Sequence, residues 1–283
     1  MPPRSDNMTE NSRSEPLQFS FSAFWATAFV ALLFVHNEVH EISHTGVGRL
    51  ICEAWGPRNF NTWRLACRET PEIVLAPIAG LIFTYGLMWI GYYIIKALDS
   101  PSKKSIGLCL IFAAMPFGRI YTVAQSGGDE MIILRGVFPE MNSLLRLAIG
   151  LSIVLACILP PLHRAFVTVF PEMNSLLRLA IGLSIVLACI LPPLHRAFVT
   201  LPQQRRLLTF AGFLLVPYVL FEIIVLRVAN PLLEQGVLAS TGVLGSPLFV
   251  NVWTGFWVLV LILSWRHLPT ILVSHDGAEG RHH

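Results

Sequence analysis

Charged residues are scarce in this 283-residue chain. Asp, Glu, Lys and Arg make up only 13% of it, whereas hydrophobic residues make up 54%. A water-soluble domain carries about 25% charged residues, so the composition excludes an ordinary soluble protein and indicates an integral membrane protein. The net charge of +3 is small, and we therefore expect no nucleic-acid partner. The expected environment is the lipid bilayer, and the expected location is a bacterial-type cell membrane.

Cysteine is also scarce, with five residues in the whole chain. Five are too few for a disulfide-rich scaffold. Cys52 and Cys67 bracket one polar loop, and they can form a disulfide if that loop faces an oxidising compartment. Cys109, Cys157 and Cys189 lie in apolar runs, where we expect inert core residues.

Long apolar runs are abundant instead. A membrane-spanning helix needs about 20 mostly apolar residues, and we count seven such spans. They are Phe19–Val35 (continuing toward Ile51), Glu72–Ile95, Ser105–Gln125, Ser143–Leu162, Ser175–Leu194, Leu207–Leu226 and Leu248–Trp265. The sequence therefore predicts an all-α fold, a polytopic transmembrane helical bundle.

Polar segments flank this bundle. Residues 1–18 are rich in Ser, Asn and Pro, a composition typical of disorder. We expect the transmembrane domain to cover residues 19–267 and a polar tail to cover residues 268–283.

The fourth and fifth spans are the same sequence. Val137 to Thr168 recurs without one change as Val169 to Thr200. Solenoid repeats diverge at most positions, so this identity indicates a tandem duplication in a six-span parent. One added crossing reverses the direction of everything after it. We expect both copies to span as a hairpin, since leaving an apolar helix outside the bilayer costs more than misplacing two basic residues.

The first span ends in the pattern H-E-x-x-H, as His40-Glu41-Ile42-Ser43-His44. Helix positions i and i+4 share one face, so His40 and His44 can direct ring nitrogens at a single ion. Glu41 lies beside them, where a carboxylate can take a proton from an activated water. Ionisable groups at membrane depth are expensive and indicate function. The sequence therefore predicts a metal site here.

A catalytic zinc site needs a third protein ligand and an open position. Span one ends at one face of the bilayer, span two returns, and span three ends at the first face again. Asp129 and Glu130 follow span three and the glycines Gly127 and Gly128, so this acidic pair is expected near the histidines. Asp129 is our predicted third ligand and Glu130 the reserve. The alternative is that the pair only caps the next helix, where carboxylates are favoured.

Four more ionisable residues lie within or beside the spans. His36, one turn before His40, is a candidate outer-shell or substrate-side group, or a polar residue lining a wet cavity. Arg119 is expected to pair with Glu222 rather than to bind a substrate carbonyl. Glu222 is also the second choice for a metal ligand, and Glu38 is expected to be solvated.

The loop between Cys52 and Cys67 has a Gly-Pro turn and several aromatic residues, which indicate an ordered segment. We expect its aromatic residues, Trp55, Phe60 and Trp63, to lie at the membrane interface rather than to gate a substrate.

With these residues, the chain resembles the intramembrane zinc metalloproteases of the site-2 protease class. That family has H-E-x-x-H in one transmembrane helix and an aspartate ligand in a later one. The resemblance covers about the first 130 residues. It implies Zn²⁺ held by His40, His44 and Asp129, with Glu41 as the general base. The family's aspartate usually lies in an Asn-Pro-Asp-Gly type segment, whereas this chain has Gly-Gly-Asp-Glu.

The resemblance implies a zinc-dependent metalloprotease that hydrolyses peptide bonds of a membrane protein or peptide within or next to the bilayer. The first alternative is a transporter or ion-handling membrane protein with a histidine-rich metal site. The second is a redox protein with histidines as axial haem ligands. The distribution of basic residues slightly favours a metal site near the outer side of the membrane.

Overall fold

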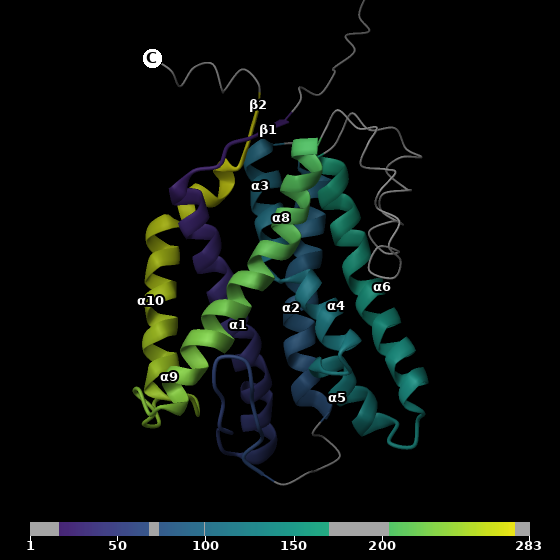
Figure 1. Ribbon diagram of the computed structural model, residues 1–283, viewed down its shortest axis with the longest axis vertical. Helices are drawn as coiled ribbons and strands as arrows, with labels where there is room; N and C mark the ends of the chain where they lie inside the picture. Colours follow the sequence, from purple (N-terminus) through teal and green to yellow (C-terminus); the bar gives the residue numbers. More distant parts are fainter. Residues whose placement is uncertain (1–16, 68–73, 99, 170–203, 275–283) are drawn as a thin grey trace, which may run out of the picture.

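The computed structural model describes residues 17–67, 74–98, 100–169 and 204–274. Its helices run along one long axis, with a short strand pair at one end (Figure 1). The helices in chain order are α1 (Ala23–Cys52), α2 (Leu75–Ala97), α3 (Pro101–Ala113), α4 (Pro116–Ala124), α5 (Gly128–Val137), α6 (Ser143–Val169), α8 (Gln204–Phe221), the π-helix η2 (Glu222–Ala229), α9 (Asn230–Glu234), α10 (Leu248–Ser264) and the 3₁₀ helix η3 (Trp265–Thr270). The strands are β1 (Leu17–Phe19) and β2 (Leu272–Ser274), which pair antiparallel.

Local sequence signals explain where the first helices begin and end. The Ser22 hydroxyl accepts a hydrogen bond from the backbone N–H of Trp25 at 3.1 Å, the usual N-cap arrangement. Glu53 then ends α1 in the left-handed conformation, with φ of 56°. The expected interruption of the third span is also present, because α3 ends before Pro116 and α4 begins at it. A proline fits the first turn of a helix but not its interior.

Five stretches in the described part of the chain are long and apolar enough to span a membrane. The stretches are Leu75–Ala97, Pro101–Ala124, Ser143–Ala165, Ala211–Glu234 and Leu248–Thr270. They correspond to the predicted spans two, three, four, six and seven. Span one is α1, which is about 45 Å long at 1.5 Å per residue but carries the ionisable residues from His36 to His44. We still expect it to cross, since it packs against α2 and α10.

The fifth predicted span, Ser175–Leu194, and with it most of the second copy, lies outside the described residues. The described helices nevertheless alternate in direction. In Figure 1, α6 ends and α8 begins at the end of the bundle that holds the strands. The direction of α8 is therefore the one expected for a six-span parent, and the count of seven stays a prediction.

The two flanking segments differ in part from our expectation. Leu17 and Gln18 fall in the segment expected to be disordered, yet they lie in β1. Their partners Val273 and Ser274 fall in the expected polar tail. Backbone hydrogen bonding between the two segments explains the difference, because strand pairing needs no particular side-chain pattern on short edges. This pairing brings the beginning of α1 and the end of η3 together.

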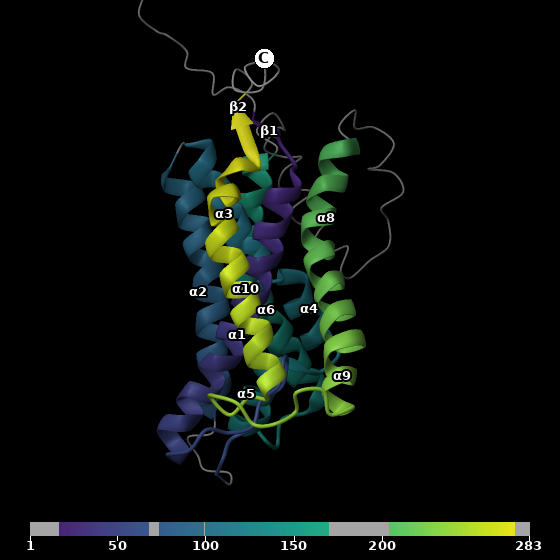
Figure 2. The same cartoon turned by 90° about the vertical axis from the view of Figure 1, so that its left-hand side faces the viewer.

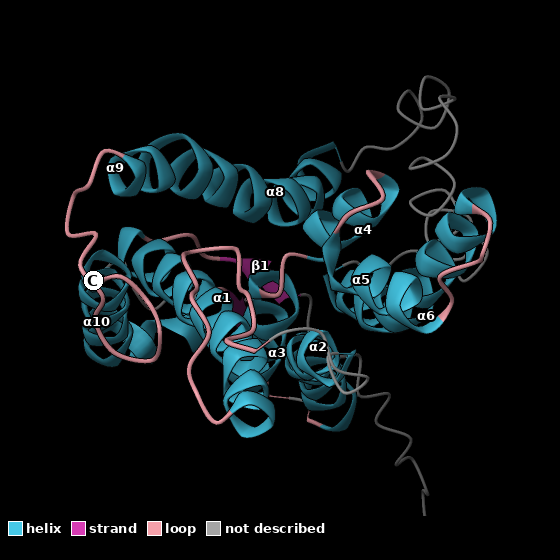
Figure 3. Cartoon of the chain, turned by 90° about the horizontal axis from the view of Figure 1, so that it is seen from below, coloured by secondary structure: helices cyan, strands magenta, loops and turns pink. Residues whose placement is uncertain are grey.

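The helices around α1 place the ionisable residues of α1 inside the bundle. α1 packs against α2 on one side and α10 on another, and α8 and η2 stand across from it (Figures 1 and 3). Figure 2 shows α8 as a separate column beside the other helices. α5 and the loop after α1 lie at the end of the bundle opposite the strands (Figure 1).

Candidate metal centre

The two motif histidines meet inside the bundle. His40 and His44 are 7% and 0% exposed. Their Nε2 atoms are 3.1 Å apart, because the i and i+4 positions of α1 direct both rings to one side. The sequence prediction that these two rings share a face therefore agrees with the structure.

Helix α2 fixes the orientation of both rings. His40 Nδ1 lies 3.0 Å from the carbonyl oxygen of Gly80 and 2.8 Å from the hydroxyl of Thr84. His44 Nδ1 lies 2.7 Å from the carbonyl oxygen of Ala76. A carbonyl can only accept, so each Nδ1 carries the proton and donates it, and each neutral ring keeps a lone pair on Nε2. Outer-shell contacts of this kind orient metal-binding histidines.

Gly80 is needed for this arrangement. A Cβ atom at this position would overlap the His44 ring and lie 2.9 Å from Cε1 of His40. The absence of a side chain lets the α2 backbone approach the histidines closely enough to accept their hydrogen bonds.

The carboxylate of Asp129 completes the cluster. α5 begins at Gly128, whose φ of +81° favours glycine, and Asp129 is in its first turn. One carboxylate oxygen lies 3.3 Å from Nε2 of His40, and the other lies 3.4 Å from Nε2 of His44. The structure thus brings together the three residues that the sequence proposed as ligands, and they could hold a metal ion.

The donor set fits a tetrahedral ion. Ligand atoms about 2.0–2.1 Å from a tetrahedral zinc lie roughly 3.3 Å from one another. Here the two Nε2 atoms are 3.1 Å apart, and each lies 3.3 or 3.4 Å from a different oxygen of Asp129. With neutral rings, the two Nε2 atoms and the Asp129 carboxylate are three lone-pair acceptors that lie close together. Three acceptors repel one another unless a positive charge lies between them. A cation is the simplest group that satisfies all three.

Arg119 and Glu130 form a second layer behind Asp129. The guanidinium of Arg119 lies 3.0 Å from Asp129 Oδ2 and 3.0 Å from Glu130 Oε1. Glu130 is 2% exposed and also accepts a hydrogen bond from the hydroxyl of Tyr85. Glu130 therefore faces Arg119 and Tyr85 and is not part of the ligand group of the described residues. Its carboxylate positions the arginine that holds Asp129.

Arg119 does not pair as predicted. We expected it to pair with Glu222, but its carboxylate partners in the described structure are Asp129 and Glu130. The break at Pro116 starts a separate short helix, α4, and α5 follows it closely. No sequence pattern specifies the register of this turn, so the nearer acidic pair was not recognised as the partner.

A cavity of about 240 Å³ opens beside the cluster. Its walls come from α1, the loop after α1, α2, α4, α5, α8 and η2. The acidic and basic residues that line it are His36, His40, Glu41, Arg119, Asp129 and Glu222. Glu222 thus faces the same space as the ligands but is not one of the three clustered residues.

Two residues of α1 reach the cavity with unused polar atoms. Glu41 is 5% exposed and His36 is 4% exposed. Among the described residues, neither Oε2 of Glu41 nor either ring nitrogen of His36 has a hydrogen-bond partner. Buried polar atoms are normally paired, so these three atoms lack the hydrogen-bond partner that their burial calls for.

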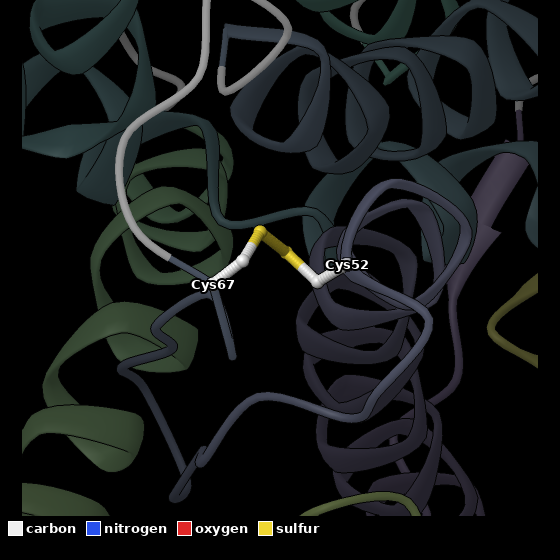
Figure 4. The surroundings of a disulfide bond; sticks show 2 residues. All are labelled: Cys52 and Cys67. Atoms are coloured by element: carbon white, nitrogen blue, oxygen red, sulfur yellow. A yellow bond between two sulfur atoms is a disulfide. The ribbon is translucent and has the colours of Figure 1, made fainter.

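The loop after α1 is ordered, as predicted, and covers the cluster. A disulfide between Cys52 and Cys67 closes it (Figure 4), as expected if the loop faces an oxidising compartment. The ring of Trp63 stacks on His44 with centroids 4.6 Å apart, and Phe60 is only 2% exposed. Both aromatics therefore pack against the protein, and the assignment of the three aromatics to the membrane interface stays a prediction. Trp55, in contrast, is 37% exposed.

Glu38 is also placed differently from our expectation. It is buried, not solvated, and Arg58 of the loop lies 2.6 Å away. Arg58 in turn lies 3.4 Å from the hydroxyl of Ser246, in the loop before α10. A buried carboxylate needs such a partner, and the partner came from a loop whose docking the sequence did not specify.

Several residues of the site were missed by sequence reasoning. Thr84 and Tyr85 are polar residues inside an otherwise apolar span, and Gly80 is a small residue in the same helix. Both features mark close helix contacts in membrane proteins and would have identified α2 as the supporting helix. Nothing in the sequence indicated that Trp63 stacks on His44.

No protein-family model, curated protein or solved structure matches this chain.

Proposed function

We propose that this protein is a membrane-embedded, zinc-dependent metalloprotease that hydrolyses peptide bonds within or next to the bilayer. The observation that carries the proposal is the set of three converging lone-pair acceptors on His40, His44 and Asp129. Two imidazoles and one carboxylate form a donor set that zinc accepts in hydrolases. The unpartnered carboxylate of Glu41 faces the same cavity.

The formal charges of the site also favour a divalent cation. Glu41, Asp129 and Glu130 are three carboxylates, and Arg119 is the cation that contacts two of them. Ionised together, these four residues leave two negative charges in a low-dielectric interior, which is costly. A divalent ion at the cluster would balance them.

Each residue then has a defined task. When bound, zinc supplies a Lewis acid that activates water and polarises a carbonyl group. Glu41 takes a proton from a water molecule in the cavity and later returns it to the leaving amine. Arg119 holds the Asp129 carboxylate at 3.0 Å, and the α2 carbonyls hold the two rings.

The proposed substrate is a membrane protein or peptide. A peptide carbonyl within a substrate helix is hydrogen-bonded, so the segment must unwind locally before it can be cleaved.

The test is metal analysis combined with Glu41→Gln in the full-length protein. We expect about one zinc per chain in both proteins. Cleavage of a quenched fluorescent peptide library should fall by about 10²- to 10⁴-fold in the variant, the usual contribution of a general base. Normal cleavage by Glu41→Gln would contradict the mechanism. Iron as the bound metal would contradict the zinc assignment, because two histidines and one carboxylate also hold iron in oxygenases.

One observation favours the alternative of ion transport. Glu222 lies in the membrane-spanning stretch Ala211–Glu234 and lines the cavity, as carboxylates along ion pathways do. A transporter would move a metal ion across reconstituted vesicles in a manner dependent on His40 and His44, and it would cleave no peptide.

A further inference from the structure

His36 differs from the other two histidines of its helical stripe. The Nδ1 atoms of His40 and His44 meet backbone carbonyls of α2. Neither nitrogen of His36 has a partner among the described residues, although the side chain is 4% exposed. Its ring lies against Phe83 with centroids 5.1 Å apart, a contact that positions the ring without using its nitrogens.

A buried polar group without a hydrogen-bond partner destabilises the folded protein. An apolar side chain at this position would avoid that cost. The cavity that His36 lines also contains Glu41 and Asp129, so a molecule bound there lies next to the His36 side chain. The unpaired state of His36 is therefore explained if its hydrogen-bond partner is that molecule.

His36 is not a fourth member of the cluster. The ligand atoms of His40, His44 and Asp129 lie within 4.8 Å of one another, and His36 does not belong to this group in the described structure. It lies four residues before His40, which is about 6 Å along the helix axis. Glu41 lies about 100° around the helix from His40, so His36 and Glu41 approach the cavity from different directions.

We propose that His36 is a second catalytic residue, whose ring N–H donates a hydrogen bond to the substrate carbonyl oxygen. This inference rests on the proposed hydrolase function. When water attacks, its proton passes to Glu41 and its oxygen bonds to the carbonyl carbon. The π electron pair of the C=O bond moves to the carbonyl oxygen, which becomes negative. His36 keeps its proton and stabilises that charge.

A neutral imidazole is well suited to this task. It has one N–H donor, and the cation Arg119 lines the same cavity, which disfavours a second positive charge on His36. A donor aimed at the developing oxyanion stabilises the transition state more than the ground state. The substrate class is therefore an amide or ester whose carbonyl becomes tetrahedral.

The test compares His36→Phe, His36→Gln and the control His163→Phe in the full-length protein. Phenylalanine keeps a ring against Phe83 but removes the N–H, whereas glutamine keeps a donor. His163 is an exposed residue of α6. The measurements are zinc content, kcat and KM for a cleaved peptide, and the affinity for a phosphinic peptide, a stable tetrahedral oxyanion.

For His36→Phe we expect unchanged zinc content and KM and a kcat lower by about 10²- to 10³-fold, the effect of losing one oxyanion donor. Affinity for the phosphinic peptide should fall in parallel, and His36→Gln should recover part of both. Loss of zinc, a change in KM alone, or unchanged phosphinic peptide affinity would overturn the role. A wild-type protein that binds no zinc and cleaves no peptide would instead reject the hydrolase proposal itself.

Discussion

The two halves of α1 are buried by different kinds of contact. The apolar half, Ala23–Val35, packs by its aromatic rings: Trp25 stacks on Phe29 with centroids 5.1 Å apart, and both meet Phe213 of α8 edge-on. The polar half, His36–Cys52, buries six polar or ionisable residues, namely His36, Glu38, His40, Glu41, His44 and Thr45. One continuous helix therefore joins a structural segment to a chemical one.

The difference shows what each kind of burial requires. Apolar packing is non-directional, and rings of suitable size meet its needs. The polar half needs specific partners, and they come from α2, α5 and the loop after α1, in the form of the Ala76 carbonyl, Asp129 and Arg58. Changes in the polar half should therefore alter metal binding, and changes in the apolar half should alter stability.

The largest effect on metal binding is expected for His44→Ala. This change removes one of three ligand atoms, so zinc affinity should fall by more than the roughly 10- to 100-fold lost with an outer-shell group. The measurement is zinc content after dialysis against a competing chelator. His163→Ala is the control, and zinc retained by His44→Ala at the wild-type level would show that the ion binds elsewhere.

A smaller but distinct effect is expected for Gly80→Ala. The new methyl group would overlap the His44 ring and displace it, so zinc affinity should fall by about 10- to 100-fold. Gly86→Ala is a matched control on the same helix, since a Cβ atom added there would meet no atom within 4 Å. Equal zinc affinities for the two variants, from chelator competition, would contradict the close approach of α2.

The smallest effect on the metal is expected for Phe29→Ala, in the apolar half. Phe29 is 7% exposed, and its loss leaves a cavity that costs about 3 kcal/mol. Thermal unfolding in detergent should begin at a lower temperature, while zinc affinity of the folded protein stays unchanged. A variant with normal stability and weakened zinc binding would contradict the assignment of stability to the apolar half and metal binding to the polar half.

The same contrast explains how much the sequence could predict. The mostly helical, membrane-type fold follows from long apolar runs, and the approach of Asp129 to the histidines follows from counting crossings. Partner choice within the site depends on distances of a few ångströms. The pairing of Arg119 with Asp129 and Glu130, and of Glu38 with Arg58, depends on a short helix and a docked loop that no periodic pattern specifies. The stacking of Trp63 on His44 has the same origin.

The pairing of β1 with β2 has a consequence for the side of the membrane from which zinc and water would reach the site. The backbone near Phe19 and Leu272 lies at one end of the bundle, and α5 with its aspartate lies at the other (Figure 1). Reporter domains attached beside these two strands would occupy the same compartment. Zinc and water would then reach the site from the opposite compartment. In sealed vesicles, a chelator should therefore inactivate the protein only when it is added on the side without the reporters.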